Sequence, residues 1–187
     1  QVFADAMDRC YGRTLGLLAE HPHVATAVHV SGPLLDWAEA HRPAMIDQLR
    51  LLVGRGQVEI LGGGYQEPML AILPDRDAIG QLVMMADRCE ELVGARPRGM
   101  WLAERVWEPQ MPSLFSEAGL RYTVIDDAHL ARAGVPEEGR FGYYLTEDVG
   151  RAIALFPSSK RMRYMIPFKP VHEVIRALWE LRYIAPR

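Results

Sequence analysis

Cysteine is scarce in this sequence, with 2 residues in 187, and the positions of these two exclude the common cysteine-based sites. Cys10 and Cys89 lie far apart and fit no metal-binding spacing. Each falls within a predicted helix, so we expect two buried free thiols. Free thiols are typical of a reducing compartment, and a cytoplasmic location is therefore expected.

The sequence also lacks an excess of positive charge and any long apolar run. The chain has 21 Lys and Arg against 24 Asp and Glu, a net charge of −3, without a basic stripe, which argues against a nucleic-acid partner. No apolar stretch is long enough to cross a bilayer and no signal-peptide pattern is present, so no membrane partner is expected. The hydrophobic fraction of 49% is enough for a globular fold with one core.

Helical and strand patterns alternate along the chain. Apolar periodicity predicts helices at 2–20, 33–40, 43–53, 75–93, 112–118 and 170–179. Apolar, β-branched runs predict strands at 24–30, 57–61, 98–102 and 121–125, with a weak hairpin at 141–145 and 151–156. This order predicts an α/β fold with parallel strands and flanking helices. No linker or repeat interrupts it, so we expect a single domain.

The stretch Trp101–Pro109 combines two carboxylates, an arginine and two tryptophans. Glu104 falls just past the carboxyl end of a predicted strand, where α/β folds carry their chemistry. A carboxylate beside a fixed cation such as Arg105 stays ionised, as a nucleophile must, and indole rings suit the apolar faces of sugars. The alternative is that the tryptophans belong to the core and that Glu104 and Arg105 form a surface pair.

Further candidates follow or interrupt the predicted strands. Glu59 lies within a buried strand, where a carboxylate is costly unless it is paired or faces a polar cavity. The three glycines at 62–64 permit a close approach to a ligand or another strand. Tyr65 and Glu67 follow on a loop, where binding residues concentrate. His29 ends its strand, either as a satisfied histidine near the core or as a hydrogen-bonding partner of the substrate.

Two acidic residues and a histidine follow the strand at 121–125. Asp126, Asp127 and His129 could form a metal site, and the paired aspartates resemble those of polysaccharide deacetylases. The chain has no His-x-x-x-His to complete such a site, so a loop-fixing or substrate-binding role is favoured for Asp127. We expect no metal or cofactor.

A basic cluster near the end of the chain has two interpretations. Lys160, Arg161 and Arg163 lie within four residues of one another. They form either a solvated patch or a group in which one cation contacts the acidic site.

Four segments, taken in order, resemble those of glycoside hydrolase family 57, which acts on α-glucans. They are residues 56–68, 101–109, 122–129 and 156–168. The last is similar to the 4-α-glucanotransferase and α-amylase branch rather than to the branching enzymes. The resemblance extends from about Phe3 to Trp179.

The resemblance implies a (β/α)7 barrel, of which this chain would supply about five or six strands. We therefore expect an incomplete barrel, with residues 1–187 forming one partial catalytic domain that is truncated at both ends. The acid, an aspartate in this family, is expected beyond residue 187. The fragment alone is then expected to be inactive.

The implied activity is retaining hydrolysis or transfer on α-1,4-glucans such as starch, glycogen and maltooligosaccharides. Glu104 would be the nucleophile of a glutamyl glycosyl-enzyme intermediate. The expected substrate-binding residues are Glu59, Trp101, Tyr65, Glu67, Asp127 and His29, and we expect Glu59, Glu104 and Asp127 to face one cleft. The alternatives are a non-catalytic glucan-binding or structural fragment and a metal-dependent, deacetylase-like protein.

Overall fold

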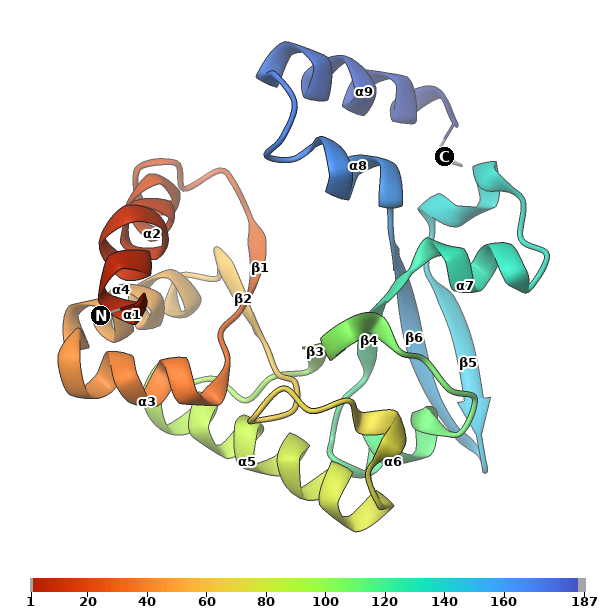
Figure 1. Ribbon diagram of the computed structural model, residues 1–187, viewed down its shortest axis with the longest axis horizontal. Coiled ribbons are helices and arrows are strands. Elements are labelled where there is room, and N and C mark those ends of the chain that lie inside the picture. Colours follow the sequence, from red (N-terminus) through yellow and green to blue (C-terminus); the bar gives the residue numbers. More distant parts are fainter. Residues whose placement is uncertain (1, 185–187) are drawn as a thin grey trace.

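The computed structural model describes residues 2–184 and shows an α/β arrangement of parallel strands and flanking helices (Figure 1). Gln1 and residues 185–187, which the single-domain prediction includes, lie outside the described residues. The helices are α1 (Val2–Ala6), α2 (Gly12–Glu20), α3 (Gly32–His41), α4 (Pro43–Gly54), α5 (Asp75–Val93), α6 (Met111–Glu117), α7 (Asp127–Arg132), α8 (Lys160–Met165) and α9 (Val171–Ile184). The strands are β1 (Thr26–His29), β2 (Val58–Leu61), β3 (Gly99–Trp101), β4 (Tyr122–Asp126), β5 (Tyr144–Asp148) and β6 (Arg151–Ser158).

The strands form two groups that one backbone bridge joins. β1 pairs with β2 in parallel, and the second group has the order β3-β4-β6-β5, parallel except for the β5–β6 hairpin. Gly62 connects the groups: its N–H donates to the Gly99 carbonyl at 2.9 Å and its carbonyl accepts from Trp101 N at 3.0 Å. The predicted α/β class with parallel strands is confirmed, and the sheet is partial rather than closed.

Glycine is required where these groups meet. A Cβ on Gly63 would lie 2.9 Å from His29 Cε1, closer than real Cβ atoms come, and 3.1 Å from the Trp101 carbonyl oxygen, so the neighbouring strands would have to shift. Of the two explanations for the triple glycine, the structure shows the close approach to another strand.

The two faces of the sheet differ in exposure. One face is buried under helices that include α4 and α6, and it carries Val58, Ile60, Met100, Thr123, Ile125, Ile153 and Leu155. Strand alternation and the observed register place mainly half-buried or exposed residues on the opposite face, which we call the open face: Ala27, His29, Glu59, Trp101, Tyr122, Val124 and Phe156, together with the buried Leu61.

The core beneath the buried face consists of two apolar clusters. The first lies among α2, α3, α4 and the β1–β2 pair, and the second lies among α6 and the four-stranded group. Helix α5 contributes to both: Ala78 and Leu82, near its start, belong to the second cluster, and Met85, Cys89 and Val93 belong to the first. One long helix therefore connects the two halves of the core.

Three features differ from the helices predicted from the sequence. Residues Met7–Tyr11 form a π-helical segment inside the predicted helix at 2–20. Helices α7 and α8 were not predicted because each is only six residues long, and between them they bury a single side chain, Leu130, so neither has apolar periodicity. Helix α9 continues to Ile184 instead of ending at residue 179.

The last two helices expose apolar side chains. Helix α9 packs on α8 and extends away from α2–α6 (Figure 1). Its exposed side chains include Val171, Trp179 and Tyr183, and Phe168 precedes it. Within residues 2–184, no helix has both the length and the apolar character that a membrane span requires.

The two thiols differ sharply in exposure. Cys89 is buried, as predicted, but Cys10 is exposed, so the prediction of a buried Cys10 is wrong. The π-helical segment that carries Cys10 turns only Met7 into the core. Burial raises the pKa of the Cys89 thiol to about 12, so that it stays protonated at pH 8.

We expect an alkylating reagent at pH 8 to label Cys10 quickly and Cys89 only after unfolding, because the thiolate is the reactive form. Mass spectrometry of peptides labelled with and without denaturant measures this difference. Equal labelling of both cysteines in the native protein would contradict the burial of Cys89.

Candidate active site

Glu104 lies on a strained turn directly after β3. It belongs to a short 3-10 segment, Ala103–Arg105, and both Glu104 and Arg105 have positive φ, at 55° and 53°. This conformation costs a non-glycine residue on the order of 1–3 kcal/mol and is enriched at functional sites. The Glu104 side chain is exposed. The turn therefore presents a carboxylate at the carboxyl end of a parallel strand.

A concavity of about 330 Å³ surrounds this turn. Charged side chains dominate its lining, which comprises Glu104, Arg105, Asp126, Ala128, His129, Arg132, Lys160, Arg163 and Tyr164. Four permanent cations, Arg105, Arg132, Lys160 and Arg163, thus line the same concavity as two carboxylates, Glu104 and Asp126.

Asp126 is held by three groups. Its Oδ1 accepts the Ala128 N–H at 3.1 Å as the N-cap of α7, and its Oδ2 lies 3.2 Å from Arg163 Nη2 and 3.7 Å from Arg105 Nε. Burial alone would raise the pKa of this carboxyl group, but the Ala128 N–H and the two guanidinium groups outweigh burial and lower the pKa below its usual value. Asp126 is thus an ionised anchor for two arginines.

Arg105 is fixed at both its side chain and its main chain. The guanidinium lies 5.9 Å from the centroid of the Trp101 ring, as well as beside Asp126. The Arg105 carbonyl is 3.0 Å from His129 Nε2. In the described part of the chain its ion pair is with Asp126 and not with Glu104, so the surface pair of Glu104 and Arg105 considered above is not formed.

Lys160, Arg161 and Arg163, the basic cluster predicted from the sequence, each contact a different acidic residue. Arg163 contacts Asp126, whereas Arg161 pairs with Glu180 on α9. The Lys160 main-chain N–H donates to Asp127 Oδ2 at 3.1 Å. The structure thus favours the interpretation in which one cation, Arg163, contacts the acidic site, and it gives Asp127 a contact that fixes the start of α8.

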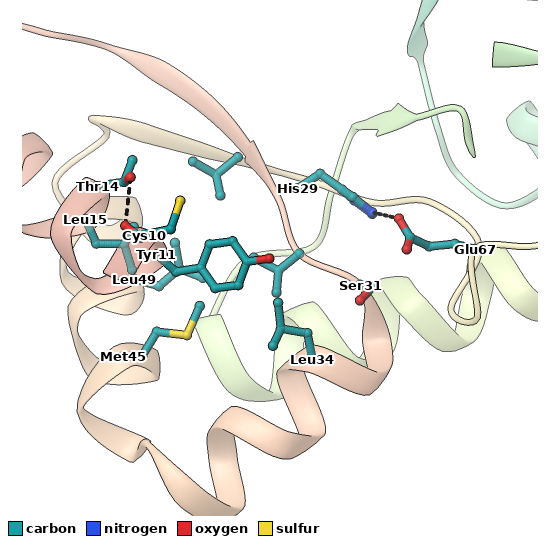
Figure 2. A pocket seen from close by; sticks show the side chains of 12 residues that line it. Cys10, Tyr11, Thr14, Leu15, His29, Ser31, Leu34, Met45, Leu49 and Glu67 are labelled. Atoms are coloured by element: carbon teal, nitrogen blue, oxygen red, sulfur yellow. Dashed lines mark hydrogen bonds and ion pairs between the residues drawn. The ribbon is translucent and has the colours of Figure 1, made fainter. Parts of the chain in front are cut away.

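His29 and Glu67 meet beside a second cavity, of about 430 Å³, between β1 and helices α2–α4 (Figure 2). His29 Nε2 lies 3.2 Å from Glu67 Oε1, and His29 Nδ1 lies 3.3 Å from the Leu61 carbonyl oxygen. Glu67 also has a positive φ of 52°. Apart from this pair the cavity lining is mainly apolar, with Leu34 and Leu49 among its residues.

Tyr65 is engaged in a contact between helices. Its hydroxyl donates to Asp36 on α3, which raises the pKa of Tyr65, and Asp36 Oδ1 accepts from Arg88 Nε on α5 at 2.8 Å. A Cβ on Gly32 would lie 2.4 Å from the Tyr65 ring. Tyr65 therefore packs against α3, and its hydroxyl faces Asp36 rather than Glu104.

Glu59 shares the open face with Trp101 but lines a different concavity from Glu104. Its neighbours there include Arg96 and Arg98. Burial, together with a hydrogen bond to Glu59, raises the pKa of the Tyr122 hydroxyl. The structure thus brings Glu104 together with Asp126 and places Asp127 against Lys160. Glu59 lines a separate concavity, so the single cleft expected for Glu59, Glu104 and Asp127 is not formed by the described residues.

The sequence alone indicates Asp126 and His129 only as possible metal ligands, and Arg163 only as one of three cations that could contact the acidic site. Their actual contacts depend on strand pairing: β4 and β6 lie side by side and bring Asp126 to Arg163, and β3 and β4 lie side by side and bring His129 to Arg105. Across residues 2–184, no group of three His, Cys, Asp or Glu side chains could hold a metal ion.

The chain resembles known proteins in both sequence and structure. The model of glycosyl hydrolase family 57 matches residues 1–180. The chain is 43% identical to an α-amylase of Pyrococcus furiosus over 96% of its own length and 28% of that protein. It is also 43% identical to a 4-α-glucanotransferase of Thermococcus litoralis, covering 96% of this chain and 27% of that protein.

Structural likeness agrees with these matches. The crystal structure of 4-α-glucanotransferase from Thermococcus litoralis matches 96% of this chain and 28% of that chain with a TM-score of 0.92. A putative polysaccharide deacetylase from Mycobacterium smegmatis, 19% identical with a TM-score of 0.65 over 93% of this chain and 58% of that chain, shares the fold alone. The chain spans 27–28% of the length of the two relatives named above. Because the family model covers residues 1–180, this chain belongs to glycosyl hydrolase family 57.

Proposed function

We propose that the chain is part of the catalytic domain of a retaining enzyme that hydrolyses or transfers α-1,4-glucans, with Glu104 as its nucleophile. The observation that carries this proposal is the position of Glu104, exposed on a strained turn at the carboxyl end of β3 and lining a charged concavity. Membership of the family and the names of the two relatives, an α-amylase and a 4-α-glucanotransferase, support the substrate class.

Glu104 suits the nucleophilic role better than its acidic neighbour. A retaining glycosidase needs one carboxylate that attacks the anomeric carbon and one carboxyl group that protonates the leaving oxygen, about 5–5.5 Å apart. Asp126 is bound to two arginines and its pKa is lowered, so it is a poor proton donor and is not free to attack. Within residues 2–184, Glu104 has no salt-bridge partner, which leaves its carboxylate available to the sugar.

We expect the acid to be an aspartate from a part of the parent enzyme other than residues 1–187, as in the family. The glycosidic bond then breaks as the acid protonates the departing oxygen and Glu104 forms an ester with the anomeric carbon. Water or a sugar hydroxyl attacks this ester in the second step, giving hydrolysis or transfer. No metal or cofactor takes part in this scheme.

The strands fit a segment of a (β/α)7 barrel whose interior the open face would line. Trp101 and Glu59 lie on this face, half-buried and exposed respectively. An indole ring offers stacking to the apolar face of a glucose unit, and a carboxylate offers hydrogen bonds to its hydroxyls. His29, on the same face and hydrogen-bonded to Glu67, would extend the glucan-binding surface.

A slow, activated fluoroglycoside tests the proposal in the parent enzyme. Its fluorine substituents slow turnover of the ester, so the glycosyl-enzyme should accumulate and carry the sugar mass on the peptide containing Glu104. Mass spectrometry of a proteolytic digest locates the label, and the Glu104→Gln variant is the control that should remain unlabelled. Labelling of another carboxylate would overturn the assignment, and glucan binding without any labelling would favour a non-catalytic glucan-binding protein.

A further inference from the structure

The turn that carries Glu104 depends on contacts from outside itself. Two consecutive non-glycine residues with positive φ are unfavourable, so the surrounding structure must hold them. Within the turn, the Arg105 N–H donates to the Leu102 carbonyl at 2.9 Å. The Arg105 carbonyl, at the other end of the same residue, points to His129 Nε2 at 3.0 Å. His129 therefore holds the Arg105–Val106 peptide, at the end of the turn that carries Glu104.

Helix α7 is anchored so that His129 reaches this peptide. Asp126 caps the helix through the Ala128 N–H and also approaches the Arg105 side chain. His129 lies within the first turn of α7, is half-buried and lines the same concavity as Glu104. Asp126, at the end of β4, thus approaches the Arg105 guanidinium, and His129, in α7, contacts the Arg105 carbonyl. Of these two contacts, the one to the carbonyl acts directly on the backbone.

The hydrogen bond also defines which imidazole nitrogen must carry a proton. A carbonyl oxygen can only accept, so the His129 Nε2 atom must carry the proton. An imidazole suits this place because it carries a donor at the far end of its ring.

We propose that His129 is a positioning residue for Glu104: its Nε2–H donates to the Arg105 carbonyl and holds the turn in the conformation that projects Glu104 into the concavity. This inference rests on the proposed role of Glu104 as nucleophile. Because His129 acts through the backbone of the turn, its removal should weaken the chemical step and leave glucan binding almost unchanged.

Two amides that differ by one methylene group give a matched test in the parent enzyme. In His129→Gln the side-chain nitrogen can reach the place of Nε2 and keep the donor, whereas in His129→Asn it falls short. We expect His129→Asn to lower kcat by about 10²-fold, the size of effect that a small misplacement of a reacting group produces. His129→Gln should keep most of kcat, and KM for amylose and the Kd for glucan should change little in both variants.

His41→Leu provides a control for the loss of a histidine-to-carbonyl hydrogen bond. His41 Nδ1 lies 2.9 Å from the Trp37 carbonyl on α3, away from the Glu104 turn, so kcat should not change in this variant. Melting temperatures of all variants report on folding.

The outcomes separate the two proposals. Equal kcat values for His129→Asn and His129→Gln would overturn the inference, as would an unchanged kcat in His129→Asn while Glu104→Gln is inactive. A loss of kcat in His129→Asn that is matched by a weaker Kd for glucan would also overturn it, because the residue would then act on binding. Activity in Glu104→Gln would instead remove the proposed function on which the inference rests.

Discussion

Replacing Glu104 with glutamine in the parent enzyme should lower kcat for amylose by roughly 10⁴-fold or more, the effect of removing a nucleophile, while glucan binding stays nearly intact. The amide keeps the shape of the exposed side chain but cannot form the glycosyl ester. Cleavage rates and binding isotherms for the same glucan measure the two quantities. Glu108→Gln, which changes an exposed carboxylate in the same stretch, should keep its activity and serves as the matched control.

A small anion should rescue the shortened side chain. In Glu104→Ala, azide can occupy the vacated space and attack an activated α-glucosyl fluoride from the side of the nucleophile. The product should be the β-glucosyl azide, with inverted configuration, because only one displacement takes place. Wild-type activity in Glu104→Gln would show that another carboxylate attacks, and Glu59 or Glu108 would then be tested next.

Phe115→Ala should lower the free energy of unfolding by about 3–5 kcal/mol, the usual cost of truncating a buried aromatic side chain. Phe115 is fully buried in the second core cluster, where its ring packs edge-on against Trp107 at 6.2 Å between centroids. Urea denaturation of the 187-residue chain, compared with wild type, measures the difference.

Phe168→Ala is the control for the same change of residue type at the surface. Its side chain is 76% exposed, so the substitution should alter the free energy of unfolding by no more than about 0.5 kcal/mol. Similar losses in the two variants would show that Phe115 is not a core residue of the folded chain.

Elements with a strong apolar pattern could be predicted from the sequence, and short ones could not. The period of α5 and the β-branched run of β4 indicate their type directly, because the buried face determines which residues are apolar. Helix α7 carries one buried residue, Leu130, and is stabilised by the side chain of Asp126 instead. Such capping depends on where the preceding strand ends, which sequence periodicity does not define.

The types of residue in the candidate site could be predicted from the sequence, but the contacts between their side chains could not. Glu104 and Asp126 could be placed at strand ends from their local sequence alone. The contact of Asp126 with Arg163 depends on the parallel register of β4 and β6, which brings together segments far apart in the chain. The concavity that Glu59 lines depends in the same way on the bridge at Gly62.

Helix α5 contributes side chains to both core clusters. Its first turns pack in one cluster and its last turns in the other. Loss of packing in either cluster therefore removes contacts that hold this helix in place. Local opening of one half should therefore be coupled to the other, and unfolding of residues 2–184 should be cooperative. A sheet joined by a single glycine bridge thereby behaves as one unit, and the β1–β2 strand pair stays aligned with the strand that leads to Glu104.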